Sequence, residues 1–213
     1  MAYCNKFPVT TARFANVAFS NGSLPDGWIQ RLMKQQPLAA PNDVKRYFVS
    51  PQESGQICML ACILGNNGEI FFPKLGEDQM ITFSSFCEKF VKTAGYEEKQ
   101  CSSDSEARKF AAQRTENSKE YPVVYFSSDT TGEKGFEEFY ILGEKINMER
   151  FQSLGVIEET THRPMDEVES FFTDLEAIFH KEEFTKAEIV AALKSFLPNF
   201  EHEEKGKNLD QKM

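Results

Sequence analysis

The chain has 213 residues, of which 40% are hydrophobic and 27% charged, and its formal net charge is −9. That length allows one large or two small domains, and the scattered lysines and arginines argue against nucleic-acid binding, which depends on clustered positive charge. The longest apolar run, residues 57–64, is far shorter than the roughly 20 residues of a spanning helix, and no basic region precedes an apolar stretch at the N-terminus, so we expect a cytoplasmic protein with no membrane partner.

Strands and helices alternate through the first third of the chain. A run rich in Val, Thr and Phe predicts a buried strand, and the Gly- and Pro-rich segment after it predicts a turn before a helix. Ser50, Pro51 and Glu53 are typical of a capped helix start. The elements expected here are a strand over 7–18, a helix near Trp28, an extended piece over 38–40, a helix over 51–64 and a strand over 69–72.

The rest of the chain becomes richer in predicted helix. Apolar residues at helical spacing indicate amphipathic helices, and Thr185 with Glu188 repeats the capping pattern. The expected elements are helices over 82–93 and 105–114, a strand over 123–126, a short helix over 147–154, a helix over 165–180 and a last helix from Thr185 to before Pro198. We predict a boundary at 160–164, between a mixed α/β region, residues 1–160, and a helical C-terminal extension, residues 161–213.

The chain contains five cysteines, an odd number, and no export signal, so we expect reduced thiols. Cys58 and Cys62 are one helical turn apart, which is compatible with a metal or redox pair. No histidine flanks them at zinc spacing, and we favour the alternative that both lie on the apolar face of a buried helix. No metal site is therefore expected.

Four short segments occur in a fixed order along the first third of the chain. They are Arg13-Phe-Ala-Asn16-Val17, Ser20-Asn-Gly22-Ser23, Lys45-Arg46-Tyr47-Phe48-Val49 and Gly68-Glu-Ile-Phe-Phe-Pro-Lys74. The series resembles the second half of extended short-chain dehydrogenases of the polysaccharide-biosynthesis type, which include UDP-N-acetylglucosamine 4,6-dehydratases and related epimerases. There the pattern runs R-Y-G-N-V, S-x-G-S, T-R-F-W, a capped helix and G-E-I-F-V-P-K.

A fifth segment extends this resemblance. Thr131-Gly-Glu133-Lys134, followed by Glu137-Glu138, is similar to the family's R-P-G-E-K-x-x-E element, although Thr130 and Thr131 stand in place of its arginine and proline. The lost guanidinium leaves the identity of the nucleotide open.

The resemblance implies an α/β fold with the C-terminal strands of a Rossmann-type parallel sheet, a mixed α/β substrate subdomain and a helical C-terminal extension. It also implies a pocket for a nucleotide-sugar, with a UDP-N-acetylhexosamine as the expected ligand. The substrate-binding residues that it indicates are Asn16, Ser20, Gly22, Ser23, Arg46, Lys74 and Glu133.

Each of these residues also has a plainer interpretation. The Asn16 amide suits a sugar hydroxyl or acetamido group, but Asn also closes turns. Gly22 and Ser23 precede a helix and so suit a phosphate, but equally a capped turn. The guanidinium of Arg46 suits bidentate phosphate binding, and the alternative is a structural salt bridge. Glu133 suits ribose or base, or a solvated loop.

Two motifs of a complete enzyme are absent from the sequence. There is no G-x-x-G-x-x-G turn for NAD(P), because Gly65-Asn-Asn-Gly68 follows a predicted helix and precedes a strand, the reverse of the required order. There is also no Tyr with a Lys four residues later, since Tyr3 and Lys6 are only three apart. We therefore assign no catalytic residue, and expect NAD(P) only in a complete enzyme.

The sequence thus predicts the substrate-binding portion of an NAD(P)-dependent nucleotide-sugar dehydratase or epimerase. Its expected partners are a missing Rossmann half or a second copy of the chain. The alternative is a non-catalytic sugar-nucleotide-binding or partner subunit, or a truncated inactive fragment.

Overall fold

The structure is a computed structural model that describes residues 7–128, 137–160 and 162–202, and it confirms the predicted α/β class. The α-helices are α1 (Leu24–Met33), α2 (Pro51–Leu64), α3 (Phe83–Thr93), α4 (Asp104–Gln113), α5 (Met165–Phe179) and α6 (Lys186–Phe196). The strands are β1 (Thr11–Ala12), β2 (Asn16–Val17), β3 (Leu38–Pro41), β4 (Lys45–Arg46), β5 (Phe48–Val49), β6 (Ile70–Pro73), β7 (Ile81–Thr82), β8 (Glu97–Cys101), β9 (Glu120–Phe126), β10 (Lys145–Asn147) and β11 (Leu154–Glu158).

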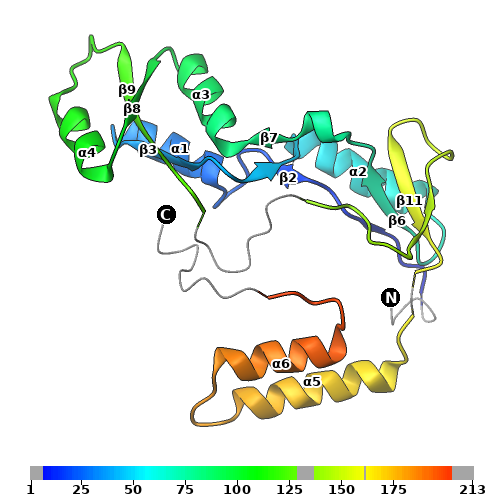
Figure 1. Ribbon diagram of the computed structural model, residues 1–213. Coiled ribbons are helices and arrows are strands. Elements are labelled where there is room, and N and C mark those ends of the chain that lie inside the picture. The colour runs from blue at the N-terminus through cyan, green and yellow to red at the C-terminus, as the bar shows by residue number, and fades with distance from the viewer. Residues whose placement is uncertain (1–6, 129–136, 161, 203–213) are drawn as a thin grey trace.

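The strands form two larger sheets and two short ladders. One sheet has the order β1-β6-β11-β10, in which β1 and β6 are parallel and the other pairs antiparallel. The other sheet, β3-β9-β8, is entirely parallel. Figure 1 shows these sheets toward opposite ends of an elongated body. The short ladders, β2 with β5 and β4 with β7, lie between the two larger sheets (Figure 1).

Two predicted elements are wrong. The strand over 7–18 is broken, because β1 pairs with β6 while β2 pairs with β5 in a different ladder. The helix over 147–154 is instead the connection between β10 and β11. There the side-chain oxygen of Asn147 accepts from the backbone N–H groups of Glu149 and Arg150, both at 3.0 Å, and this Asx turn ends the strand. Strand β8 was not expected from its polar sequence.

The core around Trp28 fixes α1 in place. Trp28 is fully buried, and its indole N–H donates to the carbonyl of Ala39 in β3 at 2.9 Å. Its ring also packs against Phe86 and Phe90 of α3, with centroids 5.6 and 5.8 Å away. Because Trp28 joins three elements, α1 has little freedom to move relative to β3.

Helix α2 differs from the expectation of a buried helix. Ser50 and Glu53 form the predicted capping box, but only Ile57 and Ala61 of the helix are buried. Cys58 and Cys62 are exposed, which corrects their assignment to a buried face. The second half of the helix, residues 57–64, is entirely apolar, and one side of the helix packs on β1 and β6. The opposite side leaves Met59 58% and Ile63 75% exposed, so α2 carries an uncovered apolar face.

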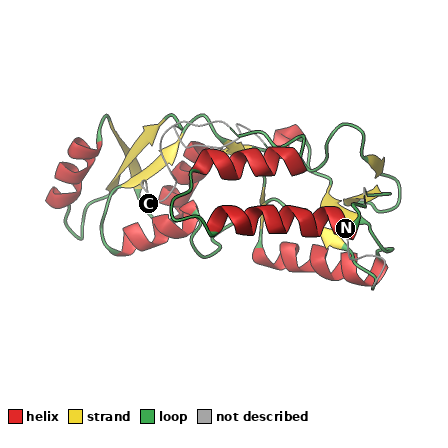
Figure 2. Ribbon diagram, turned by 90° about the horizontal axis from the view of Figure 1, so that it is seen from below, coloured by secondary structure: helices red, strands yellow, loops and turns green. Residues whose placement is uncertain are grey.

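Helices α5 and α6 form a separate hairpin. Figures 1 and 2 show the two helices side by side, and Figure 1 shows them set apart from the sheets. The rings of Phe171 and Phe196 stack between them with centroids 4.2 Å apart, yet neither helix has a buried residue. Both helices match their predicted ranges closely, while the division into two domains stays a prediction. Across the described ranges, no helix is both long and apolar enough to cross a membrane.

Candidate functional site

A cavity of about 580 Å³ opens between α1, β3 and the two short ladders. It brings together five of the seven residues that the sequence indicated, from segments as far apart as β2 and β4. These five are Asn16, Ser20, Gly22, Ser23 and Arg46. Apolar side chains form much of the remaining wall, among them Val17, Leu24, Phe48, Phe83 and Phe126. Apolar walls with a few convergent polar groups are typical of small-molecule sites.

The start of α1 forms one edge of the cavity. The Ser23 hydroxyl caps the helix by accepting from the backbone N–H of Asp26 at 3.3 Å, and the N–H of Ser23 donates to Ser20. The N–H of Gly22 donates to the Asp26 carboxylate at 3.3 Å. Gly22 has a φ of +77°, a conformation that favours glycine. The turn therefore uses these N–H groups internally, as in the plainer interpretation, while its residues still line the cavity.

Arg46 lies at the boundary between the cavity and the core. The residue is only 9% exposed, and its Nη1 donates to the carbonyl of Lys45 at 2.8 Å. Its Nε lies 3.6 Å from Oε1 of Glu137, a partner that is distant in sequence. The guanidinium thus has a structural ion pair and a place in the cavity wall at once. Neighbouring Lys45 is exposed.

The last turns of α1 contribute residues that the sequence analysis missed. Gln30, Arg31 and Lys34 line the cavity together with Gly27. Positions 27, 30, 31 and 34 share one face of a helix, so the polar residues on this face were the signal that could have identified them. Among the described residues, the charged side chains that line the cavity are Arg31, Lys34 and Arg46, of which Arg46 is paired with Glu137. Such a local potential favours an anionic ligand.

Of the two remaining predicted residues, Lys74 does not line the cavity. The ammonium group of Lys74 donates to the backbone carbonyls of Met148 and Phe151, so it ties β6 to the turn before β11. Glu133 lies outside the described residues. Arg13 forms two bonds to the Glu144 carboxylate at 3.0 and 2.8 Å and one to the carbonyl of Phe139.

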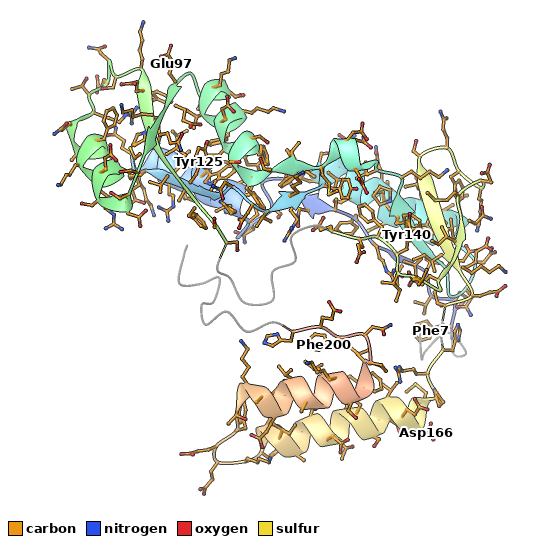
Figure 3. The ribbon with its side chains drawn as sticks, viewed as in Figure 1. Phe7, Glu97, Tyr125, Tyr140, Asp166 and Phe200 are labelled. Atoms are coloured by element: carbon orange, nitrogen blue, oxygen red, sulfur yellow. The ribbon has the colours of Figure 1, made fainter. Side chains whose placement is uncertain are left out.

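Three buried or half-buried tyrosines, Tyr47, Tyr121 and Tyr125, have raised pKa values. Figure 3 shows Tyr125 and Tyr140 in different parts of the molecule. Burial raises the pKa of Tyr125, and its hydroxyl donates to the Glu98 carboxylate at 2.6 Å, which raises that pKa further. Burial likewise raises the pKa of Tyr47 and of Tyr121. A tyrosine that acts as a base at neutral pH needs a lowered pKa, so these three do not fit that role.

The glycine-containing loop at 65–68 does not fit a dinucleotide pyrophosphate. It connects α2 to β6, and the Glu69 carboxylate accepts from the Asn66 backbone N–H at 2.7 Å and from its side chain at 2.9 Å. Arg150 adds two bonds of 2.7 Å to the same carboxylate. A built-in carboxylate therefore occupies the donors that a phosphate would require. Within the described ranges, His, Cys, Asp and Glu residues form no group of three or more that could hold a metal ion.

The family profile described as "Polysaccharide biosynthesis protein" matches residues 3–159, which include every element of the cavity. The chain belongs to the polysaccharide biosynthesis protein family. This confirms the predicted resemblance, and membership in the family supports a role in sugar biosynthesis. The match ends just before the linker to α5, so the α5–α6 hairpin lies outside it.

Comparison with solved structures finds the X-ray structure of Pen from Bacillus thuringiensis, with a TM-score of 0.49 and 18% sequence identity. The match covers 73% of this chain and 41% of Pen, so this chain spans about two fifths of that protein. No curated protein matches the chain.

Proposed function

We propose that this chain supplies the nucleotide-sugar pocket of an NAD(P)-dependent dehydratase or epimerase in polysaccharide or glycan-precursor biosynthesis. The proposed ligand is a UDP-N-acetylhexosamine, and the proposed site is the cavity between α1, β3 and the short ladders. The chain would bind and orient the sugar nucleotide, while a complementary Rossmann half would hold NAD(P), whose nicotinamide carries the hydride.

The observation that carries this proposal is the composition of the cavity wall. Arg31 and Lys34 bring positive charge to the wall, and Arg46, which pairs with Glu137, adds a guanidinium; these groups suit a diphosphate. The amide of Asn16 both donates and accepts, which suits a sugar hydroxyl or acetamido group. Phe48 and Phe126 offer flat apolar surfaces for a base or a sugar ring. The volume of about 580 Å³ lies within the range typical of small-molecule pockets.

A second set of observations supports the complementary half. Strand β1 ends its sheet, and it runs parallel to β6, so a further parallel strand could extend the sheet at that edge. Helix α2 packs on the same two strands, and its opposite side, with Met59 and Ile63, is apolar and uncovered. An edge strand beside an exposed apolar helix is the surface that another α/β unit would cover.

The proposal can be tested with the full chain by titration calorimetry with UDP-N-acetylglucosamine and by an NAD(P)H-linked turnover assay. We expect saturable binding in the micromolar range or tighter, and no turnover by the chain alone. Turnover without a partner would refute the assignment of NAD(P) to another half. A lack of binding to UDP-sugars and to UDP would refute the pocket itself.

The alternative is a non-catalytic sugar-nucleotide-binding subunit. It shares the pocket, and it would be favoured if the chain binds the sugar nucleotide but no partner restores turnover. Sedimentation of the chain, alone and mixed with a candidate Rossmann half, separates the two: complex formation with gain of turnover supports the enzyme, and complex formation without turnover supports the subunit.

A further inference from the structure

Glu137 is a half-buried acid that the proposed binding site does not yet explain. It stands at the start of a described segment, residues 137–160, that is fixed to the core at several points. The ring of Phe139 packs on Tyr47 with centroids 5.2 Å apart, and the carbonyl of Phe139 accepts from Arg13. Glu144 pairs with the same arginine. Glu137 is therefore held at a defined place rather than on a free loop.

The carboxylate of Glu137 contacts two residues of the cavity wall. Its Oε1 lies 3.6 Å from Nε of Arg46, and the side chain of Asn16 and the backbone N–H of Tyr47 lie close enough to lower its pKa. Among the described residues, its buried Oε2 has no hydrogen-bond partner. A buried carboxylate oxygen without a donor is destabilising, so its presence calls for an explanation beyond stability.

We propose that Glu137 is a positioning residue of the cavity, whose carboxylate orients the guanidinium of Arg46 and the amide of Asn16 for the ligand. This inference rests on the proposed function, and it names which residue prepares the site. The guanidinium plane is held at two points, by Glu137 at Nε and by the Lys45 carbonyl at Nη1. An amide that donates its N–H to Glu137 keeps its oxygen as an acceptor for a hydroxyl or acetamido N–H of the sugar.

The position of Glu137 also predicts that ligand binding changes the protonation of its carboxylate. Burial raises the pKa of Glu137, against the opposing effects of Arg46, the Tyr47 N–H and Asn16. The other charged groups nearby are Glu77 and Asp78, which face Tyr47, and the cations Arg31 and Lys34 across the cavity. A bound diphosphate would bring further negative charge into this cavity and raise the pKa of Glu137 again, so binding would draw a proton onto the carboxylate.

The test compares the full chain with its E137A, E137Q and E138Q variants in UDP titrations. Calorimetry in two buffers of different ionisation heat, between pH 5 and 8, measures affinity and proton uptake together. We expect E137A to bind UDP about tenfold more weakly, because Arg46 and Asn16 lose their orientation. E137Q should recover most of that affinity, since its amide oxygen still accepts from Asn16, but it should lose the proton uptake. Glu138 is the exposed neighbour, and E138Q should match the wild type in both respects.

The outcomes separate this inference from the proposed function. If the wild type does not bind UDP, the proposed function fails and the role of Glu137 fails with it. If the wild type binds UDP and E137A binds equally well, only the positioning role is refuted. Proton uptake that persists in E137Q would also refute it. If E137A does not fold, E137Q provides the test: loss of proton uptake supports the role of Glu137, and persistence of proton uptake refutes it.

Discussion

At the scale of single residues, Arg46 is the side chain on which ligand affinity should depend most. Replacing it with Gln removes the bidentate donor, and we expect UDP affinity to fall roughly 10- to 100-fold. Lys at this position should recover only part of the loss, because an ammonium group is a point charge without the planar pair of donors. Calorimetry measures the effect, and the exposed neighbour Lys45, changed to Gln, is the matched control. An R46Q variant with wild-type affinity would contradict the assignment.

For Lys74 we predict an effect on stability and none on ligand affinity, the opposite of Arg46. Because its ammonium group donates to the carbonyls of Met148 and Phe151, the K74M variant should lower the free energy of unfolding by about 1–3 kcal/mol and leave UDP affinity unchanged. Urea denaturation and calorimetry on the same samples measure both. Weaker UDP binding with normal stability would instead return Lys74 to the ligand site, where the sequence resemblance had placed it.

The sequence indicated Asn16 and Arg46 from their own chemistry and local motif, and both line the cavity. It could not identify Glu137 as their partner, because that contact joins positions about 90 to 120 residues apart and depends on how the 137–144 segment folds back. Helical spacing could have placed Arg31 and Lys34 on one face of α1. It could not show that this face lines a cavity, because solvent-exposed positive side chains on a surface helix have the same spacing.

At the scale of elements, the Glu69–Arg150 pair joins the loop after α2 to the turn between β10 and β11. Burial alone would raise the pKa of Glu69, but the bonds from Asn66 and Arg150 outweigh it and hold the pKa below its ordinary value of 4.5. A depressed pKa means that this carboxylate stabilises the fold above about pH 4.5 and loses that contribution as the pH falls further.

We therefore expect the free energy of unfolding to decrease below about pH 4.5, and the E69Q variant to show a shallower decrease. The R150M variant should lose roughly 1–3 kcal/mol near neutral pH, because it leaves a carboxylate that is only 7% exposed without its cation. Denaturation curves from pH 3 to 7 measure both variants. If the free energy of unfolding decreased equally with falling pH in E69Q and in the wild type, the Glu69–Arg150 pair would not be the cause of the loss of stability in acid.

Elements with a local start signal were predicted well from sequence, and elements set by distant pairing were not. The capping boxes of α2 and α6 contain their own hydrogen-bond partners, so their starts followed directly from the residues. The break between β1 and β2 depends on two different partner strands, β6 and β5, and nothing within residues 7–18 announces it. The polar strand β8 is specified by its pairing with β9 rather than by an apolar pattern.

At the scale of the whole molecule, the reactivity of the cysteines on α2 can show whether a partner covers the apolar face of this helix. Cys58 and Cys62 are exposed on this helix, while Cys87 is buried and burial raises its pKa to about 12. A maleimide should therefore label Cys58 and Cys62 within minutes and leave Cys87 unmodified in the folded chain. Addition of a complementary Rossmann half should protect the two α2 cysteines, as measured by peptide mass mapping. Unchanged labelling in a complex proven by sedimentation would place the interface elsewhere.

The most direct test of the central claim is a crystal structure of the full chain with UDP bound. We predict the diphosphate in the cavity between α1 and β3, with phosphate oxygens about 3 Å from the Arg46 guanidinium and Asn16 within reach of a sugar position. Electron density for UDP at another surface, or a cavity that stays empty at saturating UDP, would contradict the account.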